Sequence, residues 1–206
     1  MKKIRYKYPR TPHLPWSPGA TKDDRILPNI NHFINKEVVI TEKMDGENTS
    51  LYKDGLHARS IDSVYHPSRD WLKNFHSQIS YLLNDYRICG EYMYAKHSIF
   101  YNNLISYFYG FSVWKEDLCL DWKFTTEFFS NLNIPIPQIL YEGIYSKDIR
   151  INLDKEKQEG YVVRLKDSFL IKDFNISVAK YVRSHHVQTD NHWMHGSIIK
   201  NLLASS

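Results

Sequence analysis

The sequence predicts an α+β fold made of mostly antiparallel sheets with flanking helices. Segments with the character of strands outnumber those with helical periodicity, and the two kinds do not alternate regularly, as they would in a doubly wound fold. The chain has 206 residues, enough for one large domain or two small ones with a sizeable core. Its 42% of hydrophobic and 24% of charged residues are ordinary for a globular protein and exclude disorder of the whole chain.

The first part of the chain combines an irregular arm with a buried strand. Residues 9–28 are rich in proline and in residues that favour turns, which predicts an ordered loop within an N-terminal arm of residues 1–36. Residues 37–43 are mostly β-branched and apolar, so we expect them to form a buried strand. The pair Asp45-Gly46 then ends this strand.

A hairpin is expected next, because Asp54-Gly55 is a strong signal for a two-residue turn between strands. Its two strands would cover residues 49–53 and 56–60. The cross-strand pairs expected from this loop are Tyr52 with His57 and Ser50 with Arg59.

The remaining elements follow from periodicity and turn residues. Pro67-Ser68 opens a helix whose apolar residues recur at helical spacing. Those apolar residues are Trp71, Phe75, Ile79 and Leu82. A second, short helix is predicted at 124–132, and further strands are predicted at 87–94, 106–114, 138–142, 159–166 and 177–183.

Composition excludes several classes of protein. The only cysteines are Cys89 and Cys119, so neither a disulfide framework nor a cysteine-rich zinc site is available. No apolar run reaches the roughly 20 residues of a membrane helix, and the basic N-terminus lacks the apolar core of a signal peptide. These features predict a soluble cytoplasmic protein that binds no membrane. The formal net charge of +4 is compatible with a polyanionic partner.

Lys43 lies in the segment with the most chemical information, Thr41–Asn48 (TEKMDGEN). It ends the predicted strand and directly precedes a tight turn. Strand alternation places Lys43 on the same face as Val39 and Thr41, and Glu42 on the opposite face. Taken alone, a Lys-x-Asp-Gly sequence is more typical of an exposed turn than of an active site.

Five segments downstream of Lys-x-Asp-Gly favour an active site over an exposed turn. They are His57–Ser60 (HARS), Cys89–Met93 (CGEYM), Tyr109–Trp114 (YGFSVW), Glu159–Arg164 (EGYVVR) and Val178–Arg183 (VAKYVR). In this order, the six segments resemble motifs I, Ia, III, IIIa, IV and V of the covalent nucleotidyltransferases. This superfamily comprises ATP-dependent RNA and DNA ligases and mRNA-capping guanylyltransferases. The chain looks most like the RNA ligases, because Glu42 directly precedes the lysine and Asn48 stands where DNA ligases usually carry arginine.

The resemblance also implies a domain organisation. Residues 1–184 would form a nucleotidyltransferase (adenylation) domain that includes the N-terminal arm. Residues 185–206 would form a short His-rich extension, with no separate oligonucleotide-binding domain. Because a zinc site needs about four well-placed ligands, contact with RNA or plain packing is favoured over metal binding for the histidines of this extension. These histidines are His185, His186, His192 and His195.

The resemblance identifies Lys43 as the nucleophile that attacks the α-phosphate of ATP and forms a lysyl-AMP adduct. A lysine with the reference pKa of about 10.4 is under roughly 0.1% neutral at pH 7. The site must therefore favour the free amine, and nearby cations would do so while also binding the phosphates. Lys180, Arg59 and a bound metal are the expected sources of this charge.

Two carboxylates receive roles from the same resemblance. Glu159 is expected to bind the metal, Mg²⁺ or Mn²⁺, for which a carboxylate is a suitable hard ligand. Strand alternation would place Glu159 on the face of Tyr161 and Val163. Glu91 is expected to contact the ribose hydroxyls of the nucleotide. The structural alternatives are a surface carboxylate for Glu159 and a partly buried salt bridge for Glu91.

The resemblance assigns the remaining nucleotide contacts. Phe111 matches the aromatic residue that stacks on the purine, a contact that contributes about 1–3 kcal/mol per base. Aromatic residues in strands are also typical of cores, and Tyr109 and Trp114 are alternatives for the stacking role. Glu42 resembles the glutamate that receives the adenine amino group, which would select ATP over GTP. The nucleotide-binding set also includes Asn48 and Arg59, and Arg59 resembles the arginine near the phosphate and the RNA end.

The last motif departs from the family pattern. The family usually shows Lys-x-Lys, which places two cations on one strand face, whereas this chain has Lys180-Tyr-Val-Arg183. Lys180 is expected to contact the α-phosphate. Arg183 would face the other way unless the strand bends, so that Lys172 is an alternative source of the second cation.

Residues 10–16 of the N-terminal arm combine a cation with aromatic residues. We expect this segment either to cover the nucleotide pocket or to pack on the surface.

These assignments predict an ATP-dependent RNA ligase that joins 5′-phosphate and 3′-hydroxyl ends of RNA through lysyl-AMP and RNA-adenylate intermediates. Within the same class, the alternatives are a DNA ligase and a stand-alone adenylyltransferase that works with an accessory protein. The alternative from another class is a non-catalytic module that binds single-stranded RNA, since the chain is basic and 15% aromatic.

Overall fold

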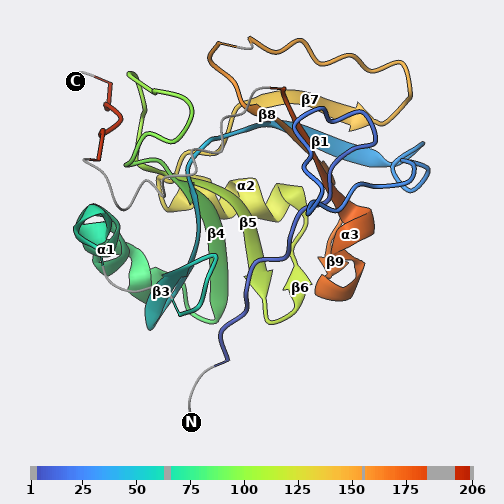
Figure 1. Ribbon diagram of the computed structural model, residues 1–206. Coiled ribbons are helices and arrows are strands. Elements are labelled where there is room, and N and C mark those ends of the chain that lie inside the picture. Colours follow the sequence, from blue (N-terminus) through green and yellow to red (C-terminus); the bar gives the residue numbers. More distant parts are fainter. Residues whose placement is uncertain (1–3, 63–65, 155, 185–197, 205–206) are drawn as a thin grey trace.

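The computed structural model of the chain describes residues 4–62, 66–154, 156–184 and 198–204. It contains two antiparallel sheets, which lie one above the other in Figure 1. This arrangement confirms the predicted α+β class. None of the helices in the described ranges is long and apolar enough to cross a lipid bilayer.

The smaller sheet has four strands in the order β10-β8-β1-β7. Their bounds are Glu37–Lys43 for β1, Ile139–Ile144 for β7, Gly160–Leu165 for β8 and Val178–Val182 for β10. The outer face of this sheet carries Ile40 and Val163, which pack with Leu14, Leu27 and Phe33 of the N-terminal arm. The arm therefore supplies the second layer that buries the outer face.

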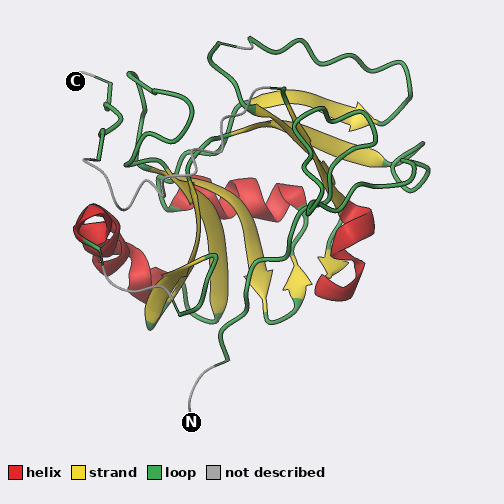
Figure 2. Ribbon diagram, in the orientation of Figure 1, coloured by secondary structure: helices red, strands yellow, loops and turns green. Residues whose placement is uncertain are grey.

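The larger sheet has six strands in the order β3-β2-β4-β5-β6-β9. Their bounds are Glu47–Tyr52 for β2, Gly55–Ala58 for β3, Tyr86–Tyr92 for β4, Phe108–Lys115 for β5, Leu118–Cys119 for β6 and Phe169–Leu170 for β9. Helices α1 (Asp70–Ile79) and α2 (Trp122–Asn131) pack on the outer face of this sheet (Figure 2). Their buried residues Leu72 and Phe129 join Ile88 of β4 in the largest apolar cluster.

A third apolar cluster lies between the inner faces of the two sheets. It joins Cys89 and Trp114 of the larger sheet to Val178 of the smaller one and to Tyr8 of the arm. A short helix, α3 (Phe174–Ser177), leads into β10 and contributes Phe174. Because helices and the arm cover the outer faces of the sheets, we expect a ligand site to lie between the two sheets.

The predicted strands and helices are present, with shifts at their ends. The helix after Pro67 starts as a 3₁₀ turn, η1 (Pro67–Arg69), and ends as another, η2 (Ser80–Leu82). Helix α2 begins earlier than predicted because the Asp121 carboxylate caps it by accepting the Phe124 N–H at 2.8 Å. Strands β6 and β9, helix α3 and the 3₁₀ turn η3 (Ile171–Asp173) were not predicted, since they are too short to show a periodic pattern.

The predicted register of the hairpin is wrong by two residues. In the structure Ser50 pairs with His57 and Tyr52 pairs with Gly55, so that Lys53 and Asp54 form the loop. Gly55 opens β3 with a φ of 152°, a conformation that residues with a Cβ rarely adopt. Arg59 therefore follows the end of β3 and is not opposite Ser50.

We expect the replacement of Gly160 by alanine to destabilise the smaller sheet strongly. A Cβ atom at Gly160 would lie 1.9 Å from the carbonyl oxygen of Tyr181, on the neighbouring strand β10. Strands β8 and β10 would have to separate, and because overpacking typically costs about 1–3 kcal/mol, we expect a loss near the upper end of that range. Urea-induced unfolding of the wild type and of Gly160→Ala measures the difference. A loss under about 1 kcal/mol would show that the two strands are not so close.

Candidate active site

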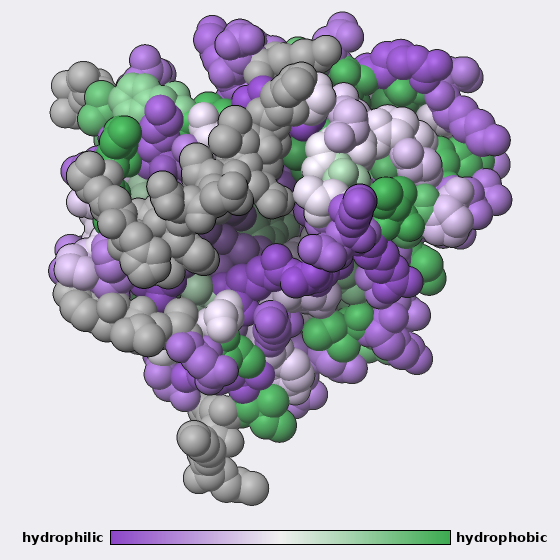
Figure 3. Space-filling model, viewed as in Figure 1, coloured by the Kyte–Doolittle hydropathy of each residue, from purple (hydrophilic) through white to green (hydrophobic). Residues whose placement is uncertain are grey.

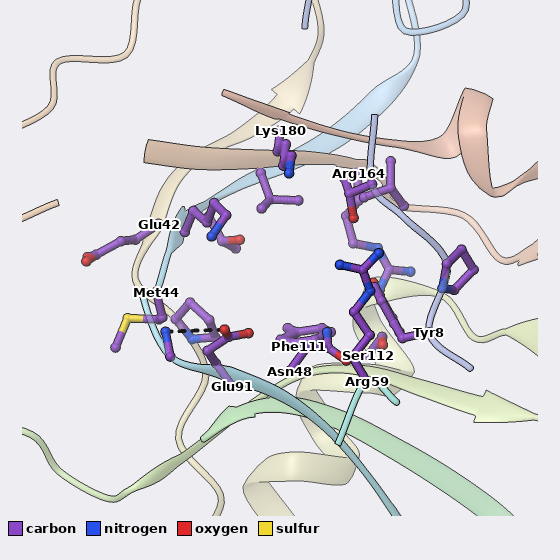
Figure 4. A pocket seen from close by; sticks show the side chains of 18 of the residues that line it. Tyr8, Glu42, Met44, Asn48, Arg59, Glu91, Phe111, Ser112, Arg164 and Lys180 are labelled. Carbon is purple, nitrogen blue, oxygen red and sulfur yellow. Dashed lines mark hydrogen bonds between the residues drawn. The ribbon is translucent and has the colours of Figure 1, made fainter. Parts of the chain in front are cut away.

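A pocket of about 540 Å³ lies between the two sheets. Figure 4 shows Asn48, Glu91 and Phe111 on its side towards the larger sheet, and Arg164 and Lys180 on its side towards the smaller sheet. The space-filling view shows a band of hydrophilic residues across the middle of this face, beside the grey atoms (Figure 3). Each of the motifs that the sequence singled out contributes at least one residue to this pocket.

Lys43 ends β1, and its Nζ donates a hydrogen bond to Oε2 of Glu159, with which it also forms an ion pair. Burial of Lys43 opposes its positive charge, but Glu159, Glu91 and Asp45 are close enough to outweigh this effect and raise the pKa of Lys43. In this arrangement the carboxylates therefore outweigh the effect that nearby cations were expected to have on the pKa of Lys43.

Glu159 lies just before the first residue of β8 and is only 3% exposed. Its expected position on the face of Tyr161 and Val163 is wrong, since these two residues pack on the outer face while Glu159 reaches Lys43. Strand alternation does not apply to a residue that precedes the strand. The register of β1 against β8 pairs Lys43 with Gly160, which brings the neighbouring Glu159 within reach of the lysine.

Glu91 pairs with Asn48 in the register of β4 against β2, and both residues line the pocket. Burial raises the pKa of Glu91 to about 8, and the negative charges of Glu159 and Asp45 act in the same direction against the opposing effect of Lys43. One carboxylate oxygen accepts the Gly46 N–H at 3.3 Å. Glu91 therefore takes up a proton more readily than an ordinary glutamate, and in its protonated form it can donate as well as accept hydrogen bonds.

A β-bulge in β5 explains why Phe111 faces the pocket. Cys89 pairs with Ser112 and Gly90 pairs with Gly110, so Phe111 is the extra residue between them. Phe111 and Ser112 both line the pocket, which a regular strand would not allow. The two alternative aromatic residues, Tyr109 and Trp114, are buried at 7% and 0% exposure and do not line it.

The Phe111 side of the pocket is apolar. The ring of Tyr8, from the arm, packs edge-on against Phe111 with 5.4 Å between centroids. Val162 of β8 packs against the same cluster. A flat ring could therefore lie between Phe111 and Val162 with apolar contacts on both faces.

Two polar groups on the larger-sheet side have buried atoms without hydrogen-bond partners among the described residues. These atoms are Oδ1 of Asn48 and Nε of Arg59. Both residues line the pocket, and Figure 4 shows Arg59 on the opposite side of it from Glu42. Unsatisfied buried polar atoms are costly in a native protein, so their presence in a pocket is typical of a ligand site.

Lys180 lies in the middle of β10, on the pocket-lining face. Its pKa is lowered by burial and by the positive charge of Lys43 nearby. Arg183, by contrast, follows the end of β10 and does not line the pocket, and Lys172 lies exposed on η3. Of the three cations considered for this motif, Lys180, Arg183 and Lys172, only Lys180 lines the pocket.

Glu42 lies at the edge of the pocket. Its carboxylate accepts a hydrogen bond from Nε2 of Gln158 at 3.1 Å. In Figure 4 it points away from Phe111 and Arg164, as strand alternation predicts. In this arrangement Glu42 does not face the apolar part of the pocket.

Several charged or titratable residues of the pocket were not among the predicted site residues, and Arg164 and His97 are two of them. Arg164 is 6% exposed, and its guanidinium donates to the carbonyl oxygens of Leu120 at 2.8 Å and Leu165 at 3.1 Å. Its place on the same face of β8 as Val162 could have been found from alternation. His97 lies in the loop between β4 and β5, where no periodic pattern could have indicated it.

The N-terminal arm contributes directly to the site. Of the segment 10–16, which was expected either to cover the pocket or to pack on the surface, Thr11 lines the pocket, as do Tyr8 and Pro9 just before it. The arm is fastened to β10 by two hydrogen bonds with the backbone of Lys180: its N–H donates to Pro12 at 2.9 Å, and its carbonyl accepts from Leu14 at 2.8 Å. The four histidines of the predicted extension, His185, His186, His192 and His195, lie outside the described residues.

His13 of the arm makes the stability of the fold depend on pH. It is 1% exposed, and burial, followed by the positive charge of Lys180, lowers its pKa to about 4 against the opposing effect of Asp24. As the pH falls below about 6.5, the His13 ring takes up a proton in the unfolded chain but not yet in the folded one. We therefore expect up to about 3 kcal/mol of stability to be lost as the pH falls from 6.5 to 4.

Urea-induced unfolding at about pH 7 and about pH 4.5 measures this loss, which should be smaller in His13→Gln. An NMR titration of the His13 ring with a midpoint near 6.5 in the folded protein would contradict the prediction.

The fold and the site together define a domain of the nucleotidyltransferase type: two antiparallel sheets with a strand-end lysine, a buried carboxylate and an apolar slot between them. The chain belongs to the RNA ligase family, whose profile matches residues 36–182. This membership confirms the resemblance to RNA ligases that the six motifs indicate. A search of curated proteins found no match.

Solved structures show the same fold. An RNA ligase of Naegleria gruberi with pyrophosphate matches with a TM-score of 0.53 at 18% identity, over 78% of this chain and 53% of that one. A lysine-to-alanine mutant of that ligase with ATP and Mn matches with a TM-score of 0.53 at 16% identity, over 75% and 52% of the two chains. The chain thus spans about half the length of these proteins.

Proposed function

We propose that this chain is the adenylation domain of an ATP-dependent RNA ligase, with Lys43 as the nucleophile. The observation that carries the proposal is the position of Lys43 at the end of β1, paired with buried Glu159, in a pocket that also contains Lys180 and Phe111. Family membership supports it, as do the ATP and AMP that the similar solved structures contain.

In the first step, Nζ of Lys43 would form a bond to the α-phosphorus of ATP while the bond to the leaving pyrophosphate breaks. The amine must lose a proton to solvent before it attacks. Its burial favours that loss, and so does the positive charge of Lys180, whose lowered pKa reflects the same proximity to Lys43. Lys180 would also stabilise negative charge on the phosphate as the transition state forms.

The other nucleotide contacts follow the shape of the pocket. The purine would lie against Phe111, and the carboxyl group of Glu91 would hydrogen-bond a ribose hydroxyl. Asn48 and Arg59, with their unsatisfied atoms, would bind polar groups of the nucleotide or of the RNA end. Glu42 would need to turn inward to contact the adenine amino group, and Arg183 would need to turn to contact a phosphate.

A divalent metal fits this site through Glu159. No three His, Cys, Asp or Glu side chains in the described part of the chain are grouped to hold a metal ion by themselves. Mg²⁺, however, is usually bound by one or two carboxylates together with substrate phosphates and water, so a single buried carboxylate beside a triphosphate is sufficient. A metal bound by Glu159 would neutralise the charge that stabilises the Lys43 ammonium and would thereby favour the free amine.

In the later steps, the AMP would pass from Lys43 to a 5′-phosphate of RNA, and a 3′-hydroxyl would then displace it. The predicted substrate is therefore RNA with 5′-phosphate and 3′-hydroxyl ends. The alternatives within the class are nicked DNA and a role as an adenylyltransferase that depends on an accessory protein. A gel assay with 5′-phosphorylated RNA and DNA strands distinguishes them.

The first step is tested by incubating the protein with ATP and Mn²⁺ and measuring its intact mass. We expect the mass to increase by one AMP residue. If no adduct forms over a range of metals and pH values, while the protein binds single-stranded RNA, the chain is a non-catalytic RNA-binding module and the proposal is wrong.

A further inference from the structure

The final segment of the described chain, residues 198–204, lies against the loop of residues 93–107 that joins β4 to β5, as the red and green traces in Figure 1 show. Backbone hydrogen bonds tie the two together, with N–H groups of Lys96, Asn201 and Leu202 donating to Ile199 at 2.7 Å, Tyr94 at 2.9 Å and Tyr101 at 2.8 Å, respectively. This segment lies beyond residue 182, where the match to the family profile ends.

Asn201 is the centre of this contact and is 0% exposed. Its side-chain oxygen accepts the N–H of Tyr101 at 3.0 Å. Its side-chain nitrogen donates to the carbonyl oxygens of Met93 at 2.8 Å and Ala95 at 3.3 Å. Its own carbonyl oxygen accepts the hydroxyl of Tyr107 at 2.9 Å. One buried side chain and its backbone therefore fix both ends of the 93–107 loop.

The other side of the same loop holds Asp45, which is 4% exposed. Oδ2 of Asp45 accepts hydrogen bonds from the N–H of Ser98 at 2.7 Å, the hydroxyl of Ser98 at 2.6 Å and the N–H of Ile99 at 2.9 Å. The N–H of Asp45 donates to the hydroxyl of Tyr101 at 3.2 Å. Charge-assisted hydrogen bonds of this kind are stronger than neutral ones, so the loop determines where Asp45 lies.

Asp45 stands two residues after Lys43, in the turn that ends β1. A shift of Asp45 therefore changes the path of the chain next to the nucleophile. The same loop also carries His97, which lines the pocket. The contacts thus form a continuous series from Asn201, through the 93–107 loop, to the turn beside Lys43.

We propose that Asn201 is a positioning residue for adenylation: by fixing the 93–107 loop against Asp45, it keeps Lys43 in place to attack the nucleotide. The inference rests on the proposed function of Lys43. A misplacement of about 1 Å by a change far from the chemistry can lower a rate about 100-fold, because reacting atoms must be held in a narrow range of geometry.

The test is single-turnover adenylation of Asn201→Ala with ATP and Mn²⁺, which yields a rate constant and a final amount of lysyl-AMP. We expect the rate constant to fall about 10-fold to 100-fold, while the final amount equals that of the wild type. A residue that only stabilises the fold would lower the final amount and leave the rate constant unchanged. Leu202→Ala is the matched control, because this neighbouring side chain is 49% exposed, and it should react at the wild-type rate.

The inference would be overturned if the rate constant of Asn201→Ala equals that of the wild type, whether or not the final amount of lysyl-AMP is lower. If this variant does not fold, hydrogen exchange of the wild type gives a second test. The amides of Asn201, Ser98 and Ile99 should then open with the same free energy, since they belong to one unit. Exchange of Asn201 while Ser98 and Ile99 stay protected would overturn the inference. A wild type that forms no lysyl-AMP would instead contradict the proposed function.

Discussion

Replacement of Lys43 by arginine is expected to abolish lysyl-AMP formation completely. Arginine keeps the positive charge that faces Glu159 and can form the same ion pair, so the fold of the site should be retained. The guanidinium, however, stays protonated at any pH at which the protein is folded and cannot act as the nucleophile. The measurement is the intact mass after incubation with ATP and a divalent metal.

The matched control is Lys123→Arg, at an exposed position of α2 that does not line the pocket, which should become adenylated as the wild type does. Urea-induced unfolding of both variants shows whether they are folded. Any AMP adduct on folded Lys43→Arg would mean that another residue is the nucleophile.

Replacement of Lys180 by methionine is expected to slow adenylation about 100-fold to 1000-fold. Methionine has a similar length and apolar character, so it can fill the space on β10 without the charge. The loss of one preorganised group that stabilises developing charge typically lowers a catalytic rate by this factor. A second effect acts in the same direction, because the pKa of Lys43 should rise further once the nearby cation is gone.

Two further variants make this prediction specific. Lys180→Arg retains the charge and should recover part of the rate. Lys172→Met removes an exposed cation that does not line the pocket and should react normally. The rates are measured by single-turnover adenylation. If Lys180→Met reacts within about threefold of the wild type, Lys180 does not contact the reacting phosphate.

The long, strongly patterned elements could be predicted from the sequence. The apolar, β-branched run at 37–43 is β1 at its predicted bounds, and the helical spacing after Pro67 corresponds to α1. Most of the predicted site residues belong to six motifs whose order along the chain resembles that of the covalent nucleotidyltransferases. These motifs meet in space because their residues end or line strands that face one pocket.

The directions of individual side chains could not be predicted where the backbone departs from a regular strand. Phe111 and Ser112 both face the pocket because of a bulge that depends on the pairing of β5 with β4. Glu159 reaches Lys43 because it precedes β8. In both cases the position is determined by contacts between strands that are far apart in the sequence.

The charge state of Lys43 could not be predicted for a similar reason. The sequence indicated which cations would be present, but the effect on the lysine depends on how close the carboxylates are. Glu159, Glu91 and Asp45 come from three separate parts of the chain, and together they determine the direction of the shift in the pKa of Lys43. Likewise, nothing in the sequence connected Asn201 to the loop that holds Asp45.

The proposed chemistry requires that Nζ of Lys43 forms the bond to the first phosphorus of the nucleotide, and locating the AMP group within the labelled protein tests this most directly. The wild type is incubated with ATP and Mn²⁺ and digested, and its peptides are sequenced by mass spectrometry. We predict that AMP is found on the peptide that contains Lys43, with the modification on Nζ of that residue. AMP attached to any other side chain would contradict this assignment.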